Sequence, residues 1–150
     1  MRPTRLSGLA ALALAAGFAS WGIAVLAYGS LPPLPRFAPA TLLLLAAVMG
    51  FTAASVRARL QGRPGTSPIV PMTVARHAAL AKAGSGAGAL FAGLWAGLLV
   101  FTGSRLEQRA AAADALTSGL GLVAALALVA AALWLERVCR VPRPPAKPVR

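Results

Sequence analysis

The chain has 150 residues, of which 58% are hydrophobic and 12% charged, and its formal net charge is +12. Soluble domains carry about a quarter charged residues because they need a solvated surface, so this composition excludes an ordinary soluble domain. The positive charge does not indicate a nucleic-acid partner, because the basic residues flank apolar segments and form no basic surface interleaved with aromatic residues.

Four apolar segments occupy most of the sequence, and no Asp or Glu interrupts them: residues 6–28, 41–56, 83–101 and 116–135. A helix of about 18 apolar residues spans the roughly 30 Å hydrocarbon core of a bilayer. We therefore expect an all-α membrane protein, a four-transmembrane-helix bundle in up-down-up-down order. The predicted spans cover about residues 6–28, 39–57, 80–101 and 115–135 within a transmembrane domain of residues 1–136.

The first segment imitates a secretory signal, because Arg2 and Arg5 precede the apolar residues. A signal peptide has an apolar region of about 7–15 residues and then a small-residue cleavage site. Here the apolar run continues for 23 residues and ends in Ala27-Tyr28-Gly29. We expect a retained helix, since cleavage would leave three spans.

The distribution of Lys and Arg predicts the orientation, because cytoplasmic flanks of membrane proteins collect these residues. Twelve of the 15 lie before the first span, in or beside the loop after the second, or after the fourth: Arg2, Arg5, Arg57, Arg59, Arg63, Arg76, Lys82, Arg137, Arg140, Arg143, Lys147 and Arg150. Only Arg36, Arg105 and Arg109 lie on the opposite side. We expect both termini in the cytoplasm (N-in/C-in), with Tyr28 and Phe101 at the outer interface and Trp134 at the inner one.

The third helix is predicted to begin at Pro71 or Thr73, before its apolar segment, and it carries the clearest packing signal. It contains two GxxxG pairs, Gly84–Gly88 and Gly93–Gly97. Small residues let helix backbones approach closely in lipid. We expect this helix at the centre of the bundle or at a contact between copies of the chain.

The sequence offers little for catalysis or for cofactor binding. The acidic residues Glu107, Asp114 and Glu136 lie at span ends or in the outer loop, whereas proton-coupled transporters place such groups inside their spans. His77 and Cys139 are the single histidine and cysteine, which is too few for a zinc or haem ligand set. We predict no enzymatic activity, no cofactor and no metal site.

Lys82 lies at the inner end of the third span and has three interpretations. It extends its amine to the interface, it pairs with Glu136, or it joins Arg76 in binding an anionic headgroup. The Pro-rich tail of residues 137–150 is predicted to lie in the cytoplasm and to contact anionic lipid, since basic residues are attracted to such a surface. Its basic residues are Arg137, Arg140, Arg143, Lys147 and Arg150.

Four stretches of the chain resemble one family: residues 1–6, the turn at residues 29–35, residues 75–82 and residues 133–142. It is an actinobacterial family of small four-span membrane proteins, catalogued as a domain of unknown function and often encoded near folate biosynthesis genes. The resemblance implies four spans in a bacterial plasma membrane, and it supplies no catalytic residues.

Two functions remain open. The first is a non-enzymatic helical membrane component that assembles with itself or with another membrane protein. The alternative is a small-solute transporter or an accessory subunit of one. Four spans without an intramembrane charge or a long inverted repeat disfavour transport, unless several copies together form a pathway.

Overall fold

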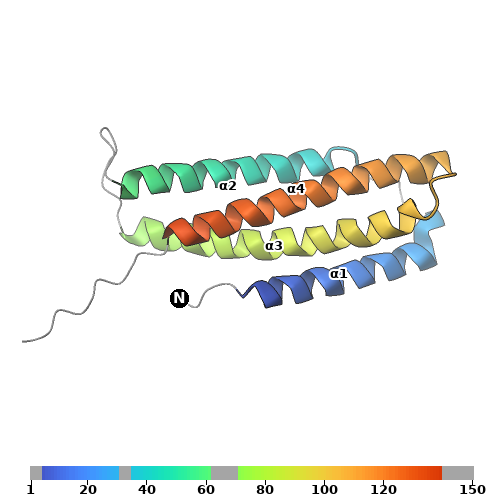
Figure 1. Ribbon diagram of the computed structural model, residues 1–150, viewed down its shortest axis with the longest axis horizontal. Coiled ribbons are helices and arrows are strands. Elements are labelled where there is room, and N and C mark those ends of the chain that lie inside the picture. The colour runs from blue at the N-terminus through green and yellow to red at the C-terminus, as the bar shows by residue number, and fades with distance from the viewer. Residues whose placement is uncertain (1–4, 31–34, 62–70, 140–150) are drawn as a thin grey trace, which may run out of the picture.

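The computed structural model describes residues 5–30, 35–61 and 71–139, which are almost entirely helical (Figure 1). The helices are α1 (Leu6–Ala27), the short 3₁₀ helix η1 (Tyr28–Ser30), α2 (Ala38–Leu60), α3 (Pro71–Gly103) and α4 (Arg109–Cys139). All four α-helices are long and apolar enough to cross a membrane. The prediction of an all-α membrane protein with four spans is confirmed.

The helices extend beyond the apolar segments, for local reasons. Pro39 lies in the first turn of α2, where its missing N–H group costs no intrahelical hydrogen bond. Helix α3 begins at Pro71, as predicted, so residues 71–79 extend the helix before the predicted span. Helix α4 begins at Arg109 because the four alanines that follow have the highest helix propensity of all residues.

The four helices lie side by side in one layer, in the order α1, α3, α4, α2 (Figure 1). Helices α3 and α4 form the central pair, while α1 packs on α3 and α2 packs on α4. Successive helices run in alternating directions along the long axis (Figure 1). Helices α1 and α2 thus occupy opposite edges although they follow one another in the sequence, while side chains of α2 such as Met49 also reach α3.

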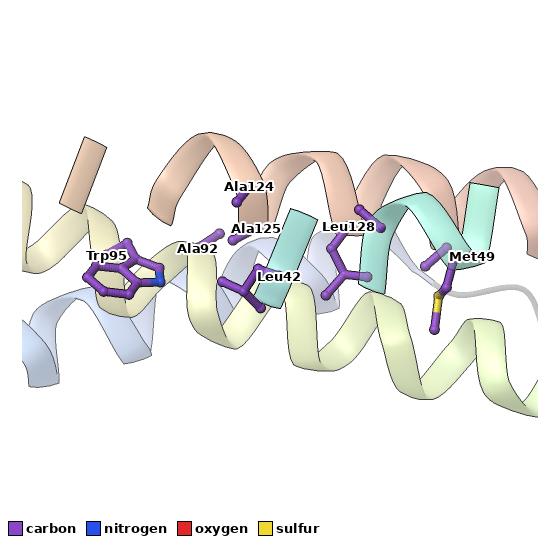
Figure 2. Packing of buried hydrophobic residues seen from close by; sticks show 9 residues of the cluster. Leu42, Met49, Ala92, Trp95, Ala124, Ala125 and Leu128 are labelled. Carbon is purple, nitrogen blue, oxygen red and sulfur yellow. The ribbon is translucent and has the colours of Figure 1, made fainter. Parts of the chain in front are cut away.

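The main hydrophobic core lies between α2, α3 and α4 (Figure 2). Its fully or largely buried residues are Leu42, Ala46, Met49, Ala92, Trp95, Ala124, Ala125, Leu128 and Ala132. A second cluster continues toward the end of α4 and contains Ala53, Val56, Ala81, Leu135 and Cys139. Alanine makes up five of the nine residues of the main core, which lets the helix axes approach closely there. Neither cluster includes a residue of α1, which is held by other means.

Candidate functional site

The contact between α1 and α3 is made mainly by backbone. The carbonyl oxygen of Ala13 lies so close to Gly93 that a Cβ added there would overlap it, and the carbonyl oxygen of Gly17 takes the same position at Gly97. The hydroxyl group of Ser20 donates a hydrogen bond of 2.9 Å to the carbonyl oxygen of Leu94. Only glycine fits at positions 93 and 97 without displacing α1.

The other glycine pair of α3 lies against different helices. A Cβ at Gly88 would lie 2.8 Å from Cγ2 of Val129 in α4. A Cβ at Gly84 would lie 2.8 Å from Sδ of Met49 in α2 and 3.5 Å from Cβ of Ala132 in α4. The two GxxxG pairs of α3 therefore meet opposite neighbours, and this places α3 between α1 and α4.

Helix α4 contributes a glycine of its own to the central contact. The indole ring of Trp95 lies over Gly121, where an added Cβ would be 2.8 Å from Cγ of the ring. Figure 2 shows this ring at the edge of the main core, beyond Ala92. The buried Nε1 of Trp95 has no hydrogen-bond partner among the described residues.

A polar and aromatic cluster joins η1, the end of α3 and the start of α4. The hydroxyl of Tyr28 donates a hydrogen bond of 2.6 Å to Oδ2 of Asp114. The rings of Tyr28 and Phe101 lie 4.9 Å apart, and the guanidinium group of Arg105 lies 4.6 Å from the centre of the Phe101 ring. Burial and the hydrogen bond to Asp114 raise the pKa of Tyr28 to about 12.

Sequence reasoning assigned Tyr28 and Phe101 to the outer interface but did not connect them with Asp114 or Arg105. The partners Tyr28 and Asp114 are 86 residues apart in the sequence. Helix α1 packs on α3 and not on α2, the next α-helix along the chain. The one available signal was that all of these residues border predicted spans on the same side.

Lys82 and Glu136 lie on helices that pack directly on each other, as their proposed pairing requires. The side chain of Lys82 is exposed, whereas Glu136 is buried beside Leu135 with only 9% of its surface exposed. Their ion pair stays a prediction. Of the basic tail residues, Arg137 lies in the last turn of α4 with an exposed side chain, while Arg140, Arg143, Lys147 and Arg150 lie outside the described residues.

The remaining candidates for chemistry are separated from one another. Nδ1 of His77 lies 2.8 Å from the carbonyl oxygen of Thr73, one turn earlier in α3. Cys139 is a free thiol, buried at the end of α4. Within the described ranges, no group of three or more His, Cys, Asp or Glu side chains is placed to hold a metal ion.

Two hollows mark the surface of the layer. An open apolar groove of about 320 Å³ runs between α1 and α3, and a more polar pocket of about 420 Å³ lies between α2 and α4. The groove is lined by Ala13, Leu14, Gly17, Phe18, Trp21, Ala96, Gly97 and Val100. The pocket is lined by Ala54, Arg57, Ala58, Gln61 and Trp134.

Four apolar helices, packed through glycine and alanine, define a multi-pass integral membrane protein. Comparison of the sequence with protein families gives a match to DUF3180, described as a protein of unknown function, over residues 9–143. The chain therefore belongs to the DUF3180 family, which confirms its predicted membership of a family of unknown function. No curated protein and no solved structure matched the chain.

Proposed function

We propose that the protein is a non-enzymatic helical component of the membrane, which assembles through the face formed by α1 and α3 with itself or with another membrane protein. The observation that carries this proposal is the apolar groove between these two helices. Its lining combines small residues, such as Gly17 and Ala96, with the large rings of Phe18 and Trp21.

Such a groove suits the backbone of another transmembrane helix. Burying apolar side chains gains little in lipid, so helices associate mainly where small residues allow close van der Waals contact. In α1, Phe18 is 72% exposed and Trp21 is 46% exposed. A helix laid along the groove would cover both rings and reach the small residues between them.

Residue content supports a role without catalysis. The sequence has one histidine, one cysteine and three acidic residues. The described acids Glu107 and Asp114 lie at the opposite end of the layer from Glu136, because they belong to the α3–α4 connection and the first turns of α4. A general acid–base pair needs two such groups within hydrogen-bond reach of one substrate.

We further infer that both termini face the cytoplasm of a bacterial plasma membrane, where the basic tail meets anionic headgroups. Twelve of the 15 Lys and Arg residues flank the ends of the spans assigned to the cytoplasm. The beginning of α1 and the end of α4 lie toward the same end of the layer (Figure 1), as this orientation requires.

Cysteine crosslinking in native membranes tests the assembly. In a Cys139→Ala background, Leu14→Cys places a single thiol on the groove, and Val48→Cys places one on the outward side of α2; these leucine and valine side chains are 63% and 55% exposed. We expect oxidation to give a covalent dimer, or a photoreactive thiol label to give an adduct with another membrane protein, from Leu14→Cys alone.

Adducts at both positions in equal yield, or at neither, would contradict assembly through this face. If Leu14→Cys gives a dimer on oxidation, and its free thiol before oxidation is modified by a water-soluble maleimide, the transport alternative would be favoured, because water would reach the contact between copies.

A further inference from the structure

The pocket between α2 and α4 lies where the apolar segments give way to charged residues. Arg57 is the first charged residue after the uncharged residues 41–56, and Trp134 precedes Glu136 and Arg137 at the end of the fourth segment. Both Arg57 and Trp134 line the pocket. Its depth is therefore that of the lipid headgroups, where Trp side chains are enriched.

The pocket is built by one face of α2. Ala54, Arg57, Ala58 and Gln61 are spaced at i, i+3, i+4 and i+7, so they project from the same side of the helix. This face flanks the stripe through which α2 packs on α4, which contains Ala53 and Val56. The small side chains of Ala54 and Ala58 leave open the space that larger residues would fill.

The chemistry of the lining fits an anion. Arg57 supplies a guanidinium group, Gln61 an amide and Trp134 an indole N–H, and all three side chains are exposed. Within the described part of the chain, no acidic side chain lines the pocket, although Glu136 lies nearby on α4. A guanidinium group binds the oxygens of a phosphate through two parallel hydrogen bonds.

We propose that this pocket binds the phosphate group of an anionic phospholipid, with Arg57 as the principal ligand and Gln61 and Trp134 as flanking donors. Basic pockets between transmembrane helices on the cytoplasmic side bind such headgroups in other proteins. A soluble phosphate ester carries the same chemistry, but the pocket opens at the headgroup level on the lipid-facing side of α2. The proposal is independent of assembly through α1 and α3.

The chain contains a matched control for this site. Arg59 lies two residues after Arg57 on the same helix end, and it is also exposed, but it does not line the pocket. A diffuse attraction between positive charge and anionic lipid would treat the two arginines alike. A specific site in the pocket predicts that Arg57 contributes to binding and that Arg59 does not.

The test measures binding of phosphatidylglycerol to the purified full-length protein in detergent by native mass spectrometry, with phosphatidylethanolamine and glycerol phosphate as comparison ligands. We expect Arg57→Gln to weaken phosphatidylglycerol binding by about tenfold, the size of one lost charge-assisted hydrogen bond, and Arg59→Gln by less than about twofold. Ala58→Leu fills the pocket while every charge is kept, and it should also weaken binding by about tenfold. If that variant is not folded, Ala54→Leu fills the same space from the other side.

Equal losses for the two arginine variants, or unchanged binding in the filled pocket, would overturn the proposal in favour of surface electrostatics. Equal binding of phosphatidylethanolamine would remove the requirement for an anionic lipid. If glycerol phosphate bound as tightly as phosphatidylglycerol, the proposal that the ligand is a lipid would be wrong, and the site would bind soluble phosphate esters.

Discussion

The hydroxyl group of Tyr28 donates a hydrogen bond to the carboxylate of Asp114, and this bond joins η1, which follows the first span, to the start of α4. Helix α1 packs on α3. The hydrogen bond to Asp114 therefore also connects the end of α1 with α4, on the other side of α3. The ring of Phe101 packs against the ring of Tyr28, and the guanidinium group of Arg105 lies over the Phe101 ring. This cluster is the polar counterpart of the glycine contacts deeper in the layer.

The titration of Tyr28 can be followed directly, because it is the single tyrosine of the chain. Burial, the hydrogen bond to Asp114 and its negative charge raise the pKa of Tyr28 to about 12 from an ordinary value of 10.0. We expect tyrosinate absorbance of the folded protein to rise with a midpoint near that value. Asp114→Asn should shift the midpoint downward but not to 10.0, since burial is the largest cause and remains.

The same shift has a consequence for stability. Because the pKa is higher in the folded protein than in the unfolded chain, the stabilisation is fully present below about pH 10 and is lost as the pH rises through about 12. Tyr28→Phe should remove this pH dependence in that window. A tyrosinate titration midpoint of the folded wild-type protein equal to that of the denatured protein would contradict the hydrogen bond between Tyr28 and Asp114.

Substitutions at Gly93 and Gly97 should loosen α1. A Cβ at position 93 would overlap the carbonyl group of Ala13, and one at position 97 would lie 3.0 Å from the backbone nitrogen of Trp21. Overpacking of this kind costs about 1–3 kcal/mol, so we expect Gly93→Ala and Gly97→Ala to lower the unfolding temperature in detergent.

Gly86 is the matched control on the same helix, because a Cβ there meets no atom within 4 Å. Gly86→Ala should be neutral or stabilising by up to about 1 kcal/mol, since alanine has the higher helix propensity. Equal effects of Gly86→Ala and Gly93→Ala would contradict backbone contact between α1 and α3.

The central contact is tested at Gly121, over which the ring of Trp95 lies. Gly121→Ala should destabilise the protein by about 1–3 kcal/mol, because an added Cβ would displace the buried ring of Trp95 from its place in the main core. Gly119→Ala is the control, since that position is open. Replacing Trp95 by Leu in the Gly121→Ala background should recover part of the loss, measured by thermal unfolding of these three variants and the wild type.

A double-mutant cycle tests the pairing of Lys82 with Glu136. If the two side chains form an ion pair, the effects of Lys82→Gln and Glu136→Gln on the free energy of unfolding should be coupled by more than about 0.5 kcal/mol. The same cycle with Arg76→Gln in place of Lys82→Gln serves as the control. Additive effects would leave Lys82 as an interfacial residue with its amine in water.

Reporter fusions test the orientation. A cytoplasm-active reporter placed after residue 150, or within residues 61–67, should be active, and one placed within residues 103–108 should be inactive, because twelve of 15 basic residues flank the predicted inner side. An inactive reporter at the C-terminus would contradict the predicted location of both termini.

The four spans were predictable because bilayer thickness requires long apolar segments, and segment length and hydropathy are local properties. The start of α3 at Pro71 was predictable for a different local reason, because Pro71 and Thr73 are residues typical of a helix start. The order of helices across the layer was not, since alanine and glycine recur on every helix and the sequence does not say which neighbour Gly88 or Gly93 meets. The pocket at Arg57 and the hydrogen bond between Tyr28 and Asp114 depend on that order, so the sequence could not predict them.

The position of α1 and α2 at opposite edges has a consequence for biogenesis. Neither α1 nor α2 has its main partner in place when it enters the membrane, because α1 packs on α3 and α2 packs on α4, which both follow in the sequence. Each must persist in lipid as an independent span, which their apolar composition permits. Among the four described spans, we expect the first extensive lateral contact after insertion of α3, and the main core is complete only once α4 packs on both α3 and α2.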